Sequence, residues 1–419
     1  MDQIFFLMRY LIKKILPSLL NRDTKIVKSD IIFFADDVDR TQKLKGKFFG
    51  AIADHTILNC LENGLNILNI GLPWSTLNRN VTYLNISTFN RLFFRYRIIA
   101  YVFKLLKIRD ISDRLKEKPF SYIIQESSAK LVIGIGLTED LCRAANKLGV
   151  ETIEIQHAMG YSRPYLSWER RRNIELPTKT ICYDSATEKT YKNFNKVEPI
   201  LLRHPHLLSA NKMNNAHSID VMEALHLDEF KHDPEKLNIL YCMQWGYDGE
   251  IDHLKGYFEN SIFPEVVDEL IDLTCDTVNW HFRFHPIQIN GYRYKNLRNY
   301  LVKYSKTKTN VYYKFASYND MRTVTSVTDA MLTMSSLSVY DAALLGQRSG
   351  FLCPTVKRHG RFKNCGEDLI SCGYLRKIDW NLDDLLAWIK WAKIKPEVEY
   401  LPSHERQIHE YLASLLSRN

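Results

Sequence analysis

The chain has 419 residues, of which 45% are hydrophobic and 25% are charged, and its formal net charge is +9 at pH 7. This length exceeds the roughly 250–300 residues that a single hydrophobic core commonly supports, so we expect two domains. The ordinary charged fraction and the absence of repeats or long low-complexity segments exclude a disordered, collagen-like or solenoid chain.

Two N-terminal stretches, Met1–Arg22 and Arg91–Arg109, alternate aromatic and aliphatic residues with arginine and lysine. Neither contains the roughly 20 uninterrupted apolar residues of a membrane span. Both are typical of a basic amphipathic surface that contacts anionic lipid headgroups. For the second stretch, a helix that packs in a domain core explains the pattern equally well.

Cysteine spacing and the N-terminal residues indicate the cell compartment. The eight cysteines form no C-x-x-C pair and no set with zinc-ligand spacing, which favours reduced, structural thiols and no metal. Charged residues interrupt the first apolar run, and no signal-peptide cleavage site follows it. We therefore expect a cytoplasmic protein on the inner face of the membrane. No nucleic-acid-binding motif accompanies the positive charge, so we expect no nucleic-acid partner.

The first half of the chain alternates strand and helix patterns, which predicts a doubly wound α/β domain over residues 1–206. Thr138 is a good helix N-cap, and Gly149 is typical of a helix C-terminus. The expected strands are Lys28–Ala35, Leu65–Gly71, Leu131–Gly136 and Glu151–His157, and the expected helices are Gly50–Asn63 and Thr138–Gly149.

Residues 207–236 are polar and are predicted to connect two domains, with a short helix at Asp220–Leu227. A second Rossmann-like domain is predicted over residues 237–400, followed by a C-terminal helix within 401–419. The expected strands are Leu237–Met243, a run before His285, Asn310–Lys314, a run before Ser335 and Ser349–Cys353, and the expected helices are Pro264–Leu273 and Val339–Leu345.

Two segments of the second domain carry the strongest functional pattern. Residues 280–288 read WHFRFHPIQ, and residues 331–346 read MLTMSSLSVYDAALLG. A strand that ends in small hydroxyl residues before a helix directs N–H and hydroxyl groups to one point, which favours a phosphate. Since ligands of open α/β sheets lie beyond the carboxyl ends of the strands, both segments are predicted to line a binding site.

The His-Pro pair, followed by Ser-Ser and SVYDAALLG, resembles the nucleotide-binding half of bacterial glycosyltransferases of the GT-B fold. The likeness is to the sialyltransferase and Kdo-transferase groups, whose donors are CMP-sugars. It implies two Rossmann-like domains that face each other across a cleft, with a terminal helix that crosses back to the first domain. It also implies a metal-independent enzyme without a cofactor.

By this resemblance, the enzyme moves Kdo or another acidic sugar from a CMP-linked donor onto a surface polysaccharide, either lipopolysaccharide O-antigen or capsule. The acceptor is then a lipid-linked compound or an oligosaccharide. Other readings stay open: an NDP-sugar glycosyltransferase, a polyol-phosphate transferase, a UDP-sugar 2-epimerase or a noncatalytic binding protein.

The resemblance assigns donor binding to the serines Ser335, Ser336 and Ser338, which would hold the phosphate. Asp341 is a candidate to accept hydrogen bonds from ribose hydroxyls, although a first-turn carboxylate favoured by the helix dipole explains it equally well.

His285 and Pro286 end the other segment of the donor half. His285 is a candidate to bind the phosphate or to assist nucleotide departure as an acid. Arg283 points to the same strand face and would neutralise a phosphate, or form a surface salt bridge.

Candidate catalytic groups come from both halves. Glu154 and His157 end a first-domain strand that resembles the QHG strand ends of polysaccharide glycosyltransferases, with Ala158 where glycine is usual. His157 is equally explained as a buried histidine bound to a carbonyl. Glu154 suits the base of an inverting reaction, and Asp248 suits the nucleophile of a retaining one.

Charged residues follow the first strand. Arg40, Lys45 and Lys47 are candidates to bind the carboxylate of an acidic sugar or the acceptor. The D-x-D pattern of Asp37-Val38-Asp39 is interpreted as loop chemistry rather than a metal site. Asp36, Asp37 and Glu250 are further candidates for the catalytic carboxylate.

Overall fold

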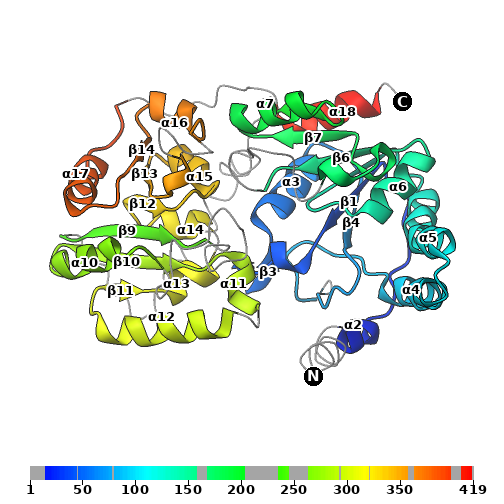
Figure 1. The fold of residues 1–419 in the computed structure, drawn as a ribbon, viewed down its shortest axis with the longest axis horizontal. Helices are drawn as coiled ribbons and strands as arrows, with labels where there is room; N and C mark the ends of the chain where they lie inside the picture. Colours follow the sequence, from blue (N-terminus) through cyan, green and yellow to red (C-terminus); the bar gives the residue numbers. More distant parts are fainter. Residues whose placement is uncertain are drawn as a thin grey trace.

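The computed structural model describes residues 15–44, 46–77, 80–157, 168–202, 235–244, 263–291, 294–319, 321–356, 363–397 and 407–417. Two domains lie side by side, and each is built on a six-stranded sheet covered by helices (Figure 1). Neighbouring strands within each of these sheets run parallel, as in the pairing of β1 with β5 and of β9 with β12. The predicted α/β class and the two Rossmann-like domains are confirmed.

The first sheet has the order β4-β1-β5-β6-β7-β8. Its strands are β1 (Ile31–Ala35), β4 (Ile67–Gly71), β5 (Leu131–Gly134), β6 (Glu151–Ile155), β7 (Lys179–Cys182) and β8 (Glu198–Leu201). The accompanying helices are α2 (Leu16–Leu20), α3 (Ala51–Glu62), α4 (Asn90–Leu105), α5 (Arg109–Ser127), α6 (Glu139–Lys147) and α7 (Ser185–Phe194). Helix α6 begins as predicted, because the Thr138 hydroxyl accepts a hydrogen bond from the Leu141 N–H.

The second sheet has the order β11-β10-β9-β12-β13-β14. Its strands are β9 (Leu237–Cys242), β10 (Val278–Arg283), β11 (Val311–Tyr312), β12 (Ala330–Thr333), β13 (Arg348–Phe351) and β14 (Leu375–Lys377). Its helices are α10 (Glu265–Leu273), α11 (Pro286–Asn290), α12 (Lys295–Thr307), α13 (Lys314–Tyr318), α14 (Met321–Thr325), α15 (Ser338–Leu344), α16 (Glu367–Ser371) and α17 (Leu382–Ala392). The strand order reverses between β9 and β12, where folds of this kind bind ligands.

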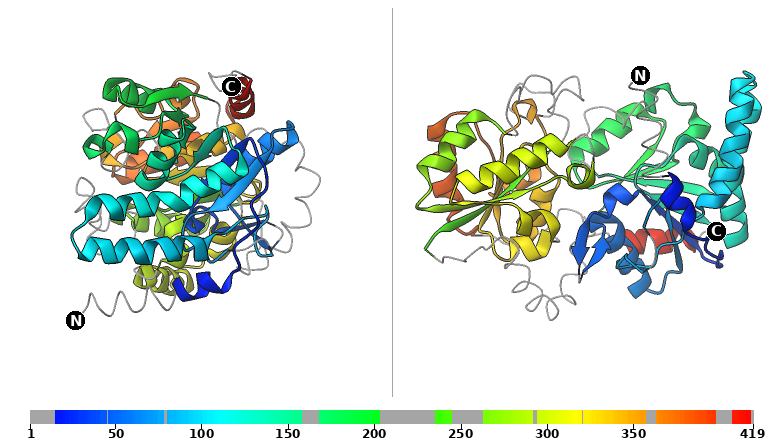
Figure 2. Two further views of the ribbon diagram at one scale, coloured as in Figure 1. Left: turned by 90° about the vertical axis from the view of Figure 1, so that its right-hand side faces the viewer. Right: turned by 90° about the horizontal axis from the view of Figure 1, so that it is seen from below.

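The last helix, α18 (Ile408–Leu416), packs against α3 in the first domain, as Figure 2 shows from below. The ammonium of Lys179, in β7, lies 5.8 Å from the centre of the Tyr411 ring in this helix. The predicted return of the C-terminal helix is therefore confirmed. The predicted helix at Asp220–Leu227 lies outside the described residues, as does most of the predicted connection.

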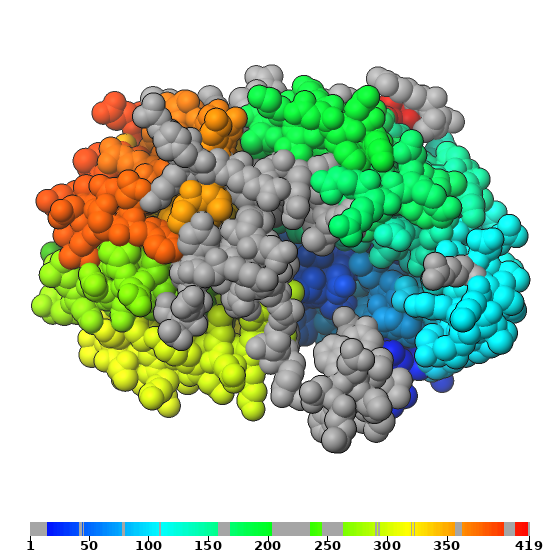
Figure 3. Space-filling view, in the orientation of Figure 1, coloured from blue at the N-terminus to red at the C-terminus, as the bar shows by residue number. Residues whose placement is uncertain are grey.

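The two domains lie against each other in the space-filling view (Figure 3). One buried hydrophobic cluster combines Ile155 and Tyr183 of the first domain with Met243 and Leu337 of the second. The short helix η2 (Asp37–Asp39) also contacts α11 across the junction. The site described below therefore rests on a packed interface between domains.

A small hairpin was not predicted. Strands β2 (Gln42–Leu44) and β3 (Lys47–Phe49) pair antiparallel after η2. Gly46 lies in the turn between them with a φ of +74°, a conformation that favours glycine. The hairpin projects from the first domain toward the second, and its strand β2 contacts α13.

Candidate functional site

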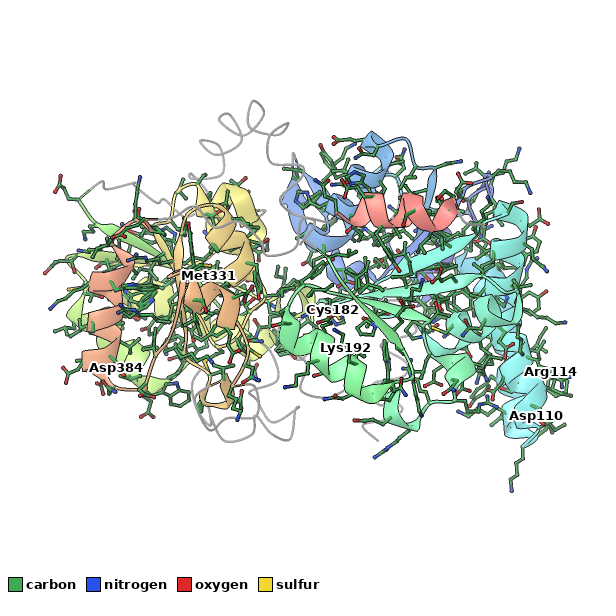
Figure 4. All side chains as sticks on the ribbon, turned by 90° about the horizontal axis from the view of Figure 1, so that it is seen from above. Asp110, Arg114, Cys182, Lys192, Met331 and Asp384 are labelled. Atoms are coloured by element: carbon green, nitrogen blue, oxygen red, sulfur yellow. The ribbon has the colours of Figure 1, made fainter. Side chains whose placement is uncertain are left out.

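A pocket of about 140 Å³ lies between the domains, at the carboxyl ends of β9, β10 and β12. Figure 4 shows the two domains side by side, with Met331 of β12 in the second domain and Cys182 of β7 in the first. The lining residues are Ala51, Ile52, His157, Cys242, Met243, Arg283, Phe284, His285, Pro286, Met321, Ser336, Leu337, Ser338 and Asp341.

The pocket brings together most of the predicted donor-binding residues and one predicted catalytic residue of the first domain. These are Arg283, His285, Pro286, Ser336, Ser338, Asp341 and His157. Six other predicted residues of the described ranges do not line it, namely Ser335, Glu154, Asp36, Asp37, Arg40 and Lys47. Asp248, Lys45 and Glu250 lie outside the described residues, so their assignments stay predictions.

His285 is the N-cap of α11. Its Nδ1 accepts a hydrogen bond from the Ile287 N–H at 3.4 Å, and its own N–H donates to the Gln288 side chain at 2.9 Å. Burial lowers the pKa of His285 to about 3, and the charges of His157 and Arg283 lower it further in the same direction. The ring is therefore neutral near pH 7, and because Nδ1 accepts, the ring proton lies on Nε2.

His157 follows β6 and reaches the pocket from the first domain. Burial lowers its pKa to about 4, while a hydrogen bond to the backbone of Ile155 opposes that shift. His157 is thus neutral near pH 7 as well. The residue before it, Gln156, is buried and bonded to Asp184 and Thr187, which holds the end of β6 in place.

Arg283 ends β10 and is 7% exposed. Its guanidinium donates to the carbonyl oxygen of Ala316 and, at 2.8 Å, to that of Asn319. Its positive charge disfavours protonation of His285, as noted above. Arg283 therefore brings a cation to the pocket wall, where carbonyl oxygens of α13 and of the residue after it hold the guanidinium. The alternative role of Arg283 in a surface salt bridge does not agree with this buried position.

The serines that follow β12 have two different positions. Ser336 and Ser338 line the pocket, their hydroxyls share a hydrogen bond, and the Ser338 N–H donates to the Ser336 hydroxyl at 3.3 Å. Ser335 turns away, and its N–H and hydroxyl donate to the Gln244 side chain at 2.9 and 3.2 Å. Ser335 thus fixes the strand end, while the other two can meet a ligand.

Two glutamines connect these strand ends, and sequence reasoning assigned neither of them a role. The Gln244 side chain joins the end of β9 to Ser335, and the Gln288 amide donates to the Gln244 carbonyl at 3.4 Å. The signal for Gln288 was present, since a capping residue followed by glutamine three positions later is a capping box. Gln244 carries no such local signal, because its partner lies on another strand.

Asp341 lies in the first turn of α15, as predicted, and is 8% exposed. It lines the pocket. Burial raises the pKa of Tyr183, a residue of the first domain, and the charges of Cys182 and Asp341 act in the same direction. Asp341 therefore lies at the interface, close to both domains. This position is compatible with contact to a ribose.

Glu154 lies behind the pocket and is 3% exposed. Its carboxylate oxygens accept hydrogen bonds from the backbone N–H groups of Gly136 and Leu137 at 2.6 and 2.8 Å. Burial raises the pKa of Glu154 to about 8, although these two bonds act in the opposite direction. This geometry indicates a role in holding the loop after β5, and a catalytic role for Glu154 stays a prediction.

Arg40 forms a buried ion pair and is not exposed for contact with a substrate. Its Nε lies 3.2 Å from the Asp54 carboxylate, both side chains are inaccessible, and its Nη2 donates to the Asn69 side chain at 2.8 Å. A substrate carboxylate would have to displace Asp54, so this arrangement argues against substrate binding by Arg40. Lys47 is exposed on β3 and does not line the pocket.

The aspartates after β1 organise their loop. Asp36 caps η2, and the Asp37 carboxylate accepts hydrogen bonds from the Ser75 hydroxyl and the Thr76 N–H at 2.5 and 2.7 Å. Burial raises the pKa of Asp39 to about 7. Within the described ranges, no group of three or more His, Cys, Asp or Glu side chains is arranged to hold a metal ion.

The chain was compared with known proteins, and no family model and no curated protein sequence matches it. Solved structures do match. UDP-GlcNAc 2-epimerase from Neisseria meningitidis, bound to UDP-GlcNAc, is 11% identical with a TM-score of 0.55, covering 93% of this chain and 99% of that one. The enzyme from Methanocaldococcus jannaschii, in complex with UDP-GlcNAc and UDP, is 12% identical with a TM-score of 0.56 and the same coverage.

The wall teichoic acid polymerase TagF is 13% identical with a TM-score of 0.53, covering 99% of this chain and 96% of that one. At these identities the likeness concerns the fold alone. It shows that this chain has the two-domain GT-B fold expected from its sequence. The narrower resemblance to the sialyltransferase and Kdo-transferase groups is not confirmed by these matches.

Proposed function

We propose that this protein is a glycosyltransferase that moves a sugar from a nucleotide-linked donor to an acceptor hydroxyl. The observation that carries the proposal is the pocket itself. It combines Ser336, Ser338 and Arg283 of the second domain with His157 of the first. The solved structures with the same fold support a nucleotide-linked donor, since one is bound to UDP-GlcNAc and a TagF structure is named for CDPG.

The donor phosphate lies, in this proposal, against Ser336 and Ser338. Hydroxyl donors and the positive charge of Arg283 stabilise a phosphate at this place. The Nε2–H of His285 donates to a phosphate oxygen and stabilises the charge that develops as the nucleotide leaves. The pocket is smaller than typical ligand sites, so it holds the reacting end of the donor while the nucleoside extends beyond it.

His157 is the base of the proposed reaction. Its neutral ring accepts the proton of the acceptor hydroxyl while that oxygen attacks the anomeric carbon, and the bond from this carbon to the phosphate oxygen breaks. The negative charge of the bound phosphate raises the pKa of His157 from its low value in the empty pocket, which makes the ring a better base.

A CMP-linked acidic sugar, with Kdo as the favoured example, is the proposed donor, and a lipid-linked or oligosaccharide precursor of a surface polysaccharide is the proposed acceptor. Both rest on the sequence resemblance. Among the described lining residues, Arg283 is the only one charged positively near neutral pH. A neutral sugar on another nucleotide therefore fits the described pocket too.

A second candidate is transfer of a polyol phosphate. It is favoured by the two histidines in the pocket and by the likeness to TagF over 99% of this chain. In that reaction the acceptor hydroxyl attacks phosphorus instead of carbon, and His157 again accepts the proton.

Nucleotide binding and product analysis test these proposals. The full chain is titrated with CMP, CDP, UDP and GDP while its thermal unfolding is recorded, because a ligand at about 100 times its Kd stabilises the native state by about 2.7 kcal/mol. Stabilisation by CMP alone supports the CMP-sugar donor, whereas stabilisation by CDP with release of CMP from a CDP-polyol supports the second candidate. If no nucleotide stabilises the protein, both are wrong.

Product analysis separates transfer from epimerisation. A UDP-sugar that changes its configuration without an acceptor identifies an epimerase and contradicts the transferase proposal. Labelled sugar that appears only in an added acceptor supports transfer.

A further inference from the structure

One face of α4 is exposed and largely apolar. Arg91, Arg95, Ile98, Val102 and Leu105 recur at intervals of four and three residues, so they lie in one row along the helix. All five are exposed, and Leu105 has 65% of its surface accessible. A soluble helix normally buries such a row against a core.

The row continues at the turn between α4 and α5. Leu106 is 63% exposed and Ile108 is 41% exposed, and Lys107 lies between them with a φ of +61°. Helix α2 adds Leu20, which is 80% exposed, since α2 contacts α4. The helices α4 and α5 lie on the side of the first domain that faces away from the second domain (Figures 1 and 2).

The charges carried by α4 itself have one sign, although the Asp23 carboxylate accepts hydrogen bonds from the Arg91 and Leu92 N–H groups at its first turn, and Asp110 follows Ile108. Helix α4 contains no acidic residue, and none of the salt bridges found between described residues involves Arg95, Lys104 or Lys107. A second copy of the same face would bring cations together without an acidic partner on α4. An anionic lipid surface instead supplies negative headgroups for the cations and an apolar layer for the leucines.

We propose that the α4 face docks on a membrane that contains anionic phospholipids. This face consists of the row Arg91, Arg95, Ile98, Val102 and Leu105 and of the exposed residues around its C-terminal end, Lys104, Leu106, Lys107 and Ile108. It lies on the membrane surface, with the apolar residues at the boundary between headgroups and acyl chains. None of the helices in the described ranges combines the length and apolar character that a membrane span needs.

Vesicle flotation of the full chain tests the proposal. Phosphatidylcholine vesicles with and without phosphatidylglycerol are compared at low and high salt. We expect binding only to the anionic vesicles, weakened by salt. The triple variant Arg95→Ala/Lys104→Ala/Lys107→Ala should lose about fivefold in affinity per residue, or about a hundredfold in all, because each cation near such a surface contributes about 1 kcal/mol.

A second variant and a matched control separate charge, apolar contact and folding. Leu105→Ser/Leu106→Ser keeps every charge and should also weaken binding at least tenfold, because both side chains leave the lipid. The control removes three exposed lysines and an exposed isoleucine from the second domain, Lys390→Ala/Lys393→Ala/Ile394→Ser/Lys395→Ala, and should bind like the parent. Circular dichroism checks that each variant is folded.

Three results would overturn the proposal. The first is that the parent chain fails to bind anionic vesicles at low salt. The second is that both α4 variants bind these vesicles as tightly as the parent. The third is a dimer that the leucine variant dissociates while vesicle binding is unchanged, because the α4 face is then an interface between copies of the chain.

Discussion

The imidazole of His157, in the first domain, lies close enough to His285, in the second, for its charge to lower the pKa of His285. Both side chains line the same pocket. Neither domain alone therefore contains the complete site. Any motion that separates the domains separates these two rings, so the proposed reaction requires the domains to be in contact.

Substitution of the two histidines should give different results. His285→Ala removes the donor to the phosphate and should weaken nucleotide binding as well as turnover. His157→Ala should lower turnover by about 10²- to 10⁴-fold, the usual contribution of a general base, with little change in nucleotide affinity. Calorimetry and single-turnover rates measure the two effects, and His409→Ala, in α18, is the control. Full turnover in His157→Ala would remove this residue from the mechanism.

The pocket serines should contribute to donor affinity. Ser336→Ala/Ser338→Ala removes the hydroxyls that face the ligand, and a hydrogen bond to a charged group contributes about 1.5–3 kcal/mol. We expect the Kd of the preferred nucleotide to rise at least tenfold with an unchanged unfolding midpoint. Ser371→Ala is the control, since its hydroxyl donates to the Glu367 carbonyl on an exposed part of α16. An equal Kd in both variants would contradict the assignment.

Acid should destabilise the protein through the two histidines. The pKa values of His157 and His285 are lowered to about 4 and about 3 in the folded chain, below the ordinary value of 6.5. Their contribution to stability is complete above pH 6.5 and is lost as the pH falls toward these values, because the unfolded state binds the protons first. Urea unfolding at several pH values measures how the free energy of unfolding changes with pH. In the variant His157→Gln/His285→Gln this change should be smaller.

Glu154→Gln should affect stability more than catalysis. Glutamine offers one oxygen to the two N–H groups of Gly136 and Leu137, so one is left unsatisfied at a cost of about 1–3 kcal/mol. The pKa of Glu154 is raised to about 8, so its own contribution to stability falls as the pH rises from 4.5 toward 8. The difference in the free energy of unfolding between the parent and the variant should therefore decrease as the pH rises. Activity per folded molecule is expected to persist, and its loss would instead support a catalytic role.

The buried ion pair provides the largest expected change in stability. Arg40→Met leaves Asp54 buried without its charged partner and should cost about 3–5 kcal/mol in the free energy of unfolding. Arg172→Ala removes a mostly exposed arginine from its pair with Glu175 and should lower the free energy of unfolding far less, because solvent screens an exposed pair. Urea denaturation compares the two. Equal losses in the free energy of unfolding would mean that, in Arg40→Met, Asp54 pairs with another group or becomes exposed to solvent.

Local sequence patterns were sufficient to predict the strands and helices that carry the pocket residues. Strand β12 is a continuous apolar run, and its buried residues could be predicted together with the serines that follow it. The rule that ligands lie beyond strand ends then selected His285 and Ser336 without a structure. These predictions depend on residues close together in the sequence.

Predictions failed where the position of a residue depends on contacts with residues far away in the sequence. Arg40 looks like a surface cation in its segment, and only Asp54 in α3 and Asn69 in β4 explain its burial. The β2–β3 hairpin has very short strands rich in lysine, which resemble a polar loop. The different positions of Ser335 and Ser336 likewise depend on Gln244, which follows the neighbouring strand β9.

The return of α18 to α3 bears on how the chain folds as it is made. Ile408 and Leu412 in this helix are fully buried, and they belong to the same hydrophobic cluster as Ile57 of α3. During synthesis α3 emerges early, but its covering by α18 must wait until the second domain has been translated. Until the C-terminus leaves the ribosome, the first domain exposes an apolar surface that a chaperone or a neighbouring nascent chain can occupy.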